Sequence, residues 1–113
     1  MSEAALVNEL RVIAEAAGAM LAVIGQRKAR GSGTTTGMPD LVLIDHGQIR
    51  LIECKRPATA EHPRGDVSVG QQAFIDRALD HGVHVYVVDS VEAFMGVLSS
   101  CRRAQGVVRR AVG

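Results

Sequence analysis

The stretch GMPDLVLIDHGQIRLIECKR, residues 37–56, places three charged side chains within two otherwise apolar segments. Asp40 opens the first segment, and Glu53 and Lys55 lie near the end of the second. Charged residues are mostly exposed in folded proteins, so strands that build a core normally avoid them. These three charges therefore call for a chemical explanation.

The two apolar segments predict a β-hairpin with strands over 40–45 and 48–55. The residues between them, His46-Gly47, have the X-Gly form of a tight two-residue turn. If those residues form the loop, Asp40 lies directly opposite Glu53, with Cβ atoms about 4.5–5.5 Å apart. The hairpin register therefore predicts that the two carboxylates are neighbours.

Alternation along the strands predicts which side chains share the face of these carboxylates. Lys55 lies on that face, two residues beyond Glu53. The other members are apolar: Val42, Ile44, Ile49 and Leu51. One face of the hairpin is therefore expected to be an apolar surface that ends in two carboxylates and an ammonium group.

Directly opposed carboxylates repel each other, so a positive charge should compensate them. A hard divalent cation does this best, because Mg²⁺ is usually held by one or two carboxylates together with substrate phosphate and water. A lysine beside it could orient a water nucleophile and stabilise charge on a phosphate. A single Asp or Glu at a strand end is usually only solvated, but the combined pattern favours a metal site. We expect Mg²⁺, with Mn²⁺ as a substitute.

The rest of the chain predicts a single α/β domain over residues 1–113 with a small mixed central β-sheet flanked by helices. The element order is α-β-β-β-α-β-α, and a basic tail spans about 101–113. Besides the hairpin, the predicted elements are a helix over 2–17, a strand over 20–26, a helix over 68–81 with Ile75, Ala78 and Leu79 facing inward, a strand over 83–88 and a helix from Asp89 or Ser90 to about Ser100.

The net charge of +1 hides an uneven distribution of basic residues. Segment 25–39 and the tail after Met95 contain arginines or lysines but no acid, which suits a polyanionic partner. The apolar pattern of the N-terminus is interrupted by charges, so it predicts neither a signal peptide nor a membrane span. Two cysteines without a disulfide or zinc spacing predict a reducing cytoplasm, in a bacterial cell or a phage-infected host.

Two motifs and their surroundings resemble a known family. "PD" at 39–40 and "ECK" at 53–55 resemble the signature of PD-(D/E)XK nucleases. The segments SVGQQAF (68–74) and HGVHVYVVDSVEAF (81–94) are similar to the virus-type replication-repair nuclease (VRR-NUC) branch. The resemblance implies a restriction-endonuclease-like core and metal-dependent hydrolysis of phosphodiester bonds.

The resemblance also implies roles for individual residues. Asp40 and Glu53 would bind the metal, with the backbone carbonyl of Cys54 as a further ligand. Lys55 would be the catalytic lysine, which positions and polarises the attacking water. The product ends would be a 5′-phosphate and a 3′-hydroxyl.

Two further positions are implied, each with an alternative. Gln71 matches a helix glutamine of the family, but Ser68-x-x-Gln71 also has the form of a capping box that only closes the start of the helix. Glu3 would supply a glutamate of the first helix. Glu9 is its rival, because both flank the apolar stripe of that helix.

Basic and hydroxyl side chains of two loops are expected to contact the phosphate backbone of DNA. The expected contacts are Arg27, Lys28, Arg30, Thr35, Arg56 and Arg64. The alternative is a pair of solvated loops without a nucleic-acid role.

The predicted function is a Mg²⁺-dependent DNA nuclease, selective for branched DNA such as junctions or flaps and acting as a homodimer. The alternative is a catalytically silent nucleic-acid-binding or assembly module, which would have no reason to keep Asp, Glu and Lys together. Apolar residues of the last helix, Val91, Phe94, Met95 and Leu98, together with Val107-Val108, are expected to offer a dimer surface. Alternatively, Phe94 and Leu98 only pack on the sheet.

Overall fold

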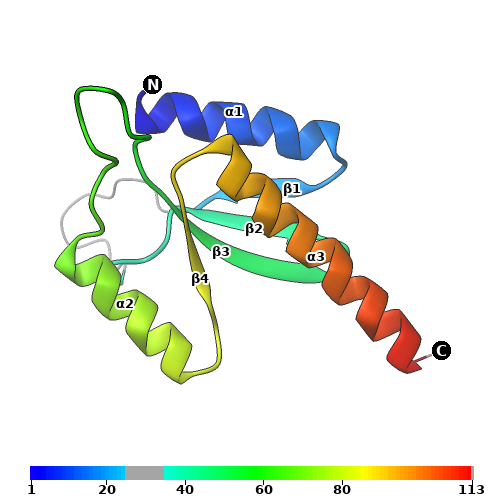
Figure 1. Cartoon of the computed structure of the whole chain (residues 1–113). Coiled ribbons are helices and arrows are strands. Elements are labelled where there is room, and N and C mark those ends of the chain that lie inside the picture. Colours follow the sequence, from blue (N-terminus) through cyan, green and yellow to red (C-terminus); the bar gives the residue numbers. More distant parts are fainter. Residues whose placement is uncertain (25–34, 113) are drawn as a thin grey trace.

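The computed structural model describes the backbone of residues 1–24 and 35–112, and the side chains of these ranges up to residue 104 (Figure 1). The order α-β-β-β-α-β-α is confirmed. The elements are α1 (Glu3–Ala16), β1 (Met20–Val23), β2 (Leu41–Asp45), β3 (Gln48–Cys54), α2 (Val69–Asp80), β4 (Val85–Val88) and α3 (Val91–Val112).

The described strands form one mixed sheet in the order β1-β2-β3-β4. The first three strands are antiparallel, whereas β4 runs parallel to β3. A parallel neighbour needs a crossover connection, and α2 provides it. The predicted mixed sheet with flanking helices is therefore confirmed.

The hairpin forms in the predicted register, from Asp45 opposite Gln48 to Leu41 opposite Ile52. His46 and Gly47 have φ angles of 50° and 76°, as a two-residue turn with both residues in the left-handed region requires. At the open end of the hairpin, β2 begins one residue later than predicted and β3 ends one residue earlier. There the side chain of Asp40 accepts a hydrogen bond from the Cys54 N–H, and this contact replaces a backbone partner.

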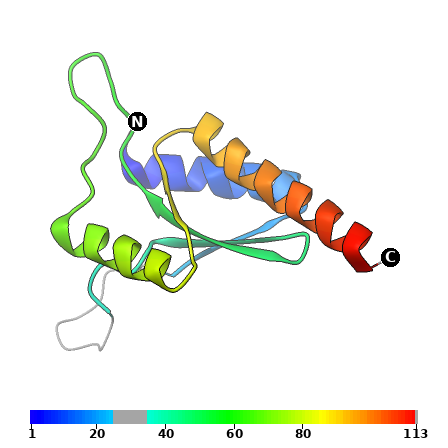
Figure 2. The same ribbon diagram turned by 60° about the horizontal axis from the view of Figure 1, so that its bottom comes forward.

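Helices α1 and α3 cover one face of the sheet, and α2 lies against the other face near β4 (Figures 1 and 2). The core between α1, α3 and the sheet is aliphatic, with a single Phe at its centre. Its largest fully buried side chains include Leu6, Leu10, Leu41, Leu43, Ile52, Val88 and Phe94. The opposite face, which carries Glu53, is covered only in part, by α2 near β4.

Helix α2 is less buried than its sequence predicts. None of its residues is fully buried. Ile75 and Ala78 are half-buried, as expected for inward residues, but Leu79 is 59% exposed, and its prediction as an inward residue is wrong. The helix packs along β4 at the sheet edge, so only a narrow stripe of it meets the protein.

Helix α3 begins where it was predicted but extends further than predicted. The hydroxyl of Ser90 accepts a hydrogen bond from the Ala93 N–H, so of the two predicted starts Ser90, and not Asp89, caps the helix. The helix also continues to Val112, through the segment predicted as a basic tail. Within the described residues, no helix has the combination of length and apolar composition that crossing a bilayer requires.

Arg102 joins three elements at the end of the sheet away from Asp40. Its Nε donates to Oδ2 of Asp45 at 3.2 Å, and its Nη2 donates to the carbonyl of Ala17 at 2.9 Å. Burial of Asp45 alone would raise the pKa of its carboxyl group, but contacts from His46 and Arg102 outweigh burial and lower that pKa. This cluster fixes α3 against α1 and the hairpin.

Candidate functional site

The predicted catalytic residues gather at the open end of the hairpin, on the face that α2 partly covers. Glu53 and Lys55 are buried, with 2% and 8% of their surface exposed. Asp40 is half-buried and accepts a hydrogen bond from Cys54 N at 2.9 Å. Strand β3 carries Glu53, and its continuation carries Lys55 on the same face. The structure therefore brings these charges together as the register predicts.

Gln71 reaches the cluster from the first turn of α2. Its Oε1 accepts hydrogen bonds from Lys55 Nζ at 2.6 Å and from the backbone N–H of Ser68 at 2.9 Å. Its Nε2 donates to Oε2 of Glu53 at 2.9 Å. The capping box is also complete, because Ser68 Oγ accepts from the Gln71 N–H. Gln71 thus closes the helix start and contacts two residues of the cluster at once.

The two carboxylate oxygens of Glu53 have different surroundings. Its Oε2 lies 3.4 Å from Lys55 Nζ, whereas its Oε1 is buried without a hydrogen-bond partner in the described part of the chain. Burial and, to a smaller degree, the like charge of Asp40 raise the pKa of Glu53 to about 7, although Lys55 opposes this rise. A buried carboxylate oxygen without a donor is a natural ligand for a cation.

The donor set fits Mg²⁺, which prefers oxygen ligands. Asp40 and Glu53 would hold the ion, with the carbonyl of Cys54 as the further ligand implied by the resemblance. Among the residues described, no three His, Cys, Asp and Glu side chains form a metal-binding group, so substrate phosphate and water would complete the shell.

The thiol of Cys54 does not belong to this site. The side chain is fully buried in the core. Burial, together with the carboxylates of Glu3, Asp40 and Glu53, raises the pKa of the thiol to about 12. A thiol with such a pKa is neither a ready nucleophile nor a thiolate ligand. Both cysteines are free and buried.

Glu3 is the better placed of the two candidate glutamates of the first helix. It opens α1, whose N-terminal end lies beside the open end of the hairpin (Figure 1). Burial and the charge of Asp40 raise the pKa of Glu3, while Lys55 lowers it, so Glu3 shares the field of the cluster. Glu9 lies almost two turns further along the helix.

The residues predicted to contact DNA have different surroundings. Thr35 lines a cavity beside α2, and Arg56 is half-buried directly after Lys55. Arg64 lies 3.9 Å from the carboxylate of Asp89, in an exposed ion pair. The other three, Arg27, Lys28 and Arg30, lie outside the described residues.

Sequence analysis missed Gly37, whose backbone packs against the start of α2, next to Gln71. Its φ is +80°, and a Cβ at this position would overlap with the carbonyl group of Gly70 and lie 3.0 Å from the N atom of Gln71. The signal was present in the sequence as a glycine just before Pro39-Asp40, but its partner could not be predicted. Gly37 allows the backbone before β2 to pack directly on the start of α2.

Comparison with known protein families agrees with this geometry. The model of the VRR-NUC domain matches residues 5–92, which include Asp40, Glu53, Lys55 and Gln71. The match begins two residues after Glu3. A comparison with curated proteins finds no match. Because the family model matches most of the chain, the chain belongs to the VRR-NUC domain family.

Proposed function

We propose that this VRR-NUC nuclease is a Mg²⁺-dependent DNA endonuclease that hydrolyses phosphodiester bonds and prefers branched DNA. The observation that carries the proposal is the convergence of Asp40, Lys55 and Gln71 on Glu53, whose Oε1 is buried and has no hydrogen-bond partner among the described residues. A silent module would gain nothing from keeping this charge arrangement buried.

The chain's own residues define the chemistry. Lys55 Nζ is held between Gln71 Oε1 and Glu53 Oε2, and it would hold the attacking water and donate to a phosphate oxygen. Gln71 fixes the direction of that ammonium group, because its amide nitrogen is anchored on Glu53. Mg²⁺, when bound, would supply Lewis-acid stabilisation of the negative charge on the phosphate. Burial of Glu53 and Lys55 strengthens each of these interactions by excluding water.

A panel of DNA substrates tests this function. Flap, fork, four-way-junction and duplex DNAs of equal length would be incubated with Mg²⁺, Mn²⁺ or EDTA, and the products resolved on denaturing gels. We expect cleavage with either metal and none with EDTA, faster cleavage of branched substrates than of duplex, and 5′-phosphate ends. Binding of DNA without cleavage under every metal condition would favour the silent module.

We also propose a homodimer, with an interface other than the one predicted from sequence. Phe94 and Leu98 are buried in the core, with 0% and 2% of their surface exposed, so they cannot form a dimer surface. Of the other residues predicted for that surface, Met95 is 43% exposed and Val91 is half-buried, and the side chains of Val107-Val108 lie outside the described residues. An apolar row crosses three strands instead, where Met20 pairs with Ile44 and Ile44 pairs with Ile49. These residues are 59%, 38% and 66% exposed, and such a row can pack on its own copy about a two-fold axis.

Light scattering at micromolar concentration tests the dimer. We expect twice the monomer mass for the wild-type protein and the monomer mass for Ile49→Asp, because a buried unpaired carboxylate would oppose association. Val12→Asp is the matched control, since Val12 is 67% exposed on the outer side of α1. A wild-type monomer that still cuts four-way junctions in paired strands would overturn the dimer proposal.

A further inference from the structure

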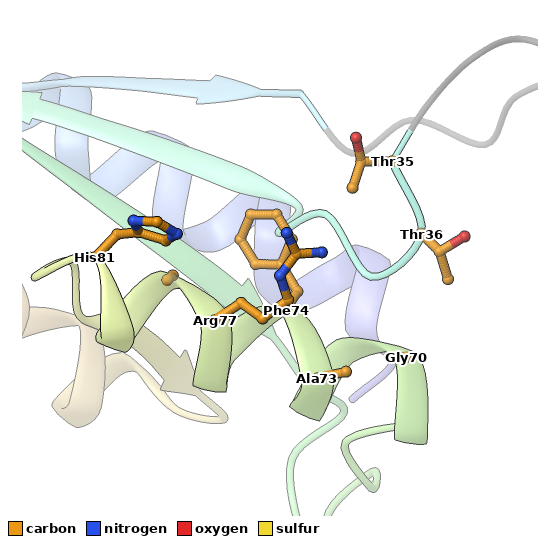
Figure 3. Close-up of a pocket in the computed structure, with 8 residues that line it drawn as sticks. Thr35, Thr36, Gly70, Ala73, Phe74, Arg77 and His81 are labelled. Carbon is orange, nitrogen blue, oxygen red and sulfur yellow. The ribbon is translucent and has the colours of Figure 1, made fainter.

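A cavity of about 480 Å³ lies along α2, from Gly70 near its start to His81 at its end (Figure 3). Phe74, Arg77 and His81 project into it from one face of the helix, as their spacing of three and four residues requires. Thr35 and Thr36 form part of the facing wall. The volume is within the range of small-molecule sites.

The walls of the cavity combine an aromatic ring, a guanidinium group and hydroxyl groups. The lining is mostly apolar, and none of its residues is acidic. Phe74 is half-buried and offers a flat apolar ring, while Arg77 can pair with a phosphate or stack on a planar group. The two threonines and His81 can hydrogen-bond to the edge of such a group. This combination suits a nucleotide: a planar heterocycle attached to an anion.

Helix α2 contributes residues to both the cavity and the carboxylate cluster. Gln71 reaches Glu53 from the first turn of α2, and Phe74 enters the cavity one turn later on the same helix. Near the start of the helix Gly70 lines the cavity, and the segment at Thr36 and Gly37 packs directly against it. On the proposed path, a DNA strand with a phosphate at Glu53 continues along α2 to the cavity.

We propose that this cavity receives one unpaired nucleobase of the DNA strand beside the cleaved bond. A paired base stays in its stack and cannot enter a side pocket, whereas a base at a branch point is already free. Phe74 would stack on the base and Arg77 would bind its phosphate. The proposal rests on the proposed nuclease function and supplies a physical source for its preference for branched DNA.

Fluorescence of 2-aminopurine tests the pocket independently of catalysis. The base analogue is placed as the first unpaired nucleotide of a flap, or within a matched duplex, and binding is measured in EDTA. We expect quenching only in the flap complex, and about tenfold tighter binding of flap than of duplex, as stacking of one base on an aromatic ring provides. Phe74→Leu should lose both effects, while Phe74→Tyr should keep them.

Matched variants and a free nucleotide distinguish binding of a base in this cavity from nonspecific binding of DNA. Arg77→Gln should weaken flap binding more than Arg11→Gln, which removes an exposed arginine from α1. Thermal melting by circular dichroism identifies any variant that fails to fold. If Phe74→Leu does not fold, quenching and flap binding are compared between Phe74→Tyr and the wild type. Quenching that does not depend on Phe74 would overturn the proposal, as would deoxyadenosine monophosphate binding as tightly as the flap.

The same experiment distinguishes failure of the pocket from failure of the nuclease function. Cleavage by the wild-type protein without quenching that depends on Phe74 would overturn the pocket alone. Quenching that depends on Phe74, in a protein that cleaves no DNA with any metal, would support the pocket and overturn the proposed function alone.

Discussion

Glu53→Gln should reduce DNA cleavage by about 10³-fold or more and, at the same time, make the metal-free protein more stable above pH 7. The loss of activity follows because the amide removes one of the two carboxylates that would hold the cation. The gain in stability follows because a neutral amide does not carry the buried charge that Glu53 carries at that pH. A residue kept for stability alone would show no such opposition between activity and stability.

The raised pKa of Glu53 determines the direction in which the stability of the protein changes with pH. The pKa of Glu53 is about 7 in the folded protein, raised by burial from its ordinary value of 4.5. The folded state therefore binds more protons than the unfolded state between these two values, and stability is lost as pH rises through this window. Above pH 7 the loss is complete. In Glu53→Gln this contribution disappears, so its stability should change less between pH 5 and pH 8.

Melting temperatures in EDTA at pH 5 and pH 8, for the wild type and for Glu53→Gln, measure this effect. Addition of Mg²⁺ at pH 8 should raise the melting temperature of the wild type and leave Glu53→Gln nearly unchanged, because a ligand stabilises the state that binds it. Glu15→Gln, an exposed position on α1, is the matched control. Wild-type cleavage by Glu53→Gln, or equal pH dependence in both proteins, would contradict the assignment.

The hairpin could be predicted from sequence because its information is local. Alternating residues define the strands, His46-Gly47 defines the turn, and the turn defines the register that opposes Asp40 and Glu53. The same local logic gave the order of the elements and the capping box at Ser68. These features depend on residues only a few positions apart.

The remaining features depend on contacts between distant segments. The two roles of Gln71 follow from the path by which α2 returns to the sheet, which no local pattern specifies. The exposure of Leu79 follows from the position of α2 at the sheet edge. The burial of Phe94 and Leu98 follows from the packing of α3 on the covered face. The catalytic roles themselves stay predictions until variants are assayed.

Gly37→Ala should lower the rate of cleavage by about 100-fold, although Gly37 carries no functional group. A Cβ at this position meets the Gly70 carbonyl, which belongs to the backbone at the start of α2 and cannot move alone. The helix start must shift, and Gln71 shifts with it, so Lys55 and Glu53 lose the amide that orients them. A displacement of about 1 Å in a catalytic arrangement can cost about 10²-fold in rate.

Gly82→Ala separates this displacement from backbone strain. Gly82 follows α2 at its other end and has a φ of +82°, close to the +80° of Gly37, but a Cβ there would meet nothing within 4 Å. Both variants should lose about 1–2 kcal/mol of stability from the left-handed conformation. Single-turnover cleavage well below the melting temperatures should then be slow only for Gly37→Ala, with the affinity for DNA less affected than the rate. Equal rates in the two variants would mean that strain alone accounts for Gly37, and that the start of α2 does not depend on it for its position.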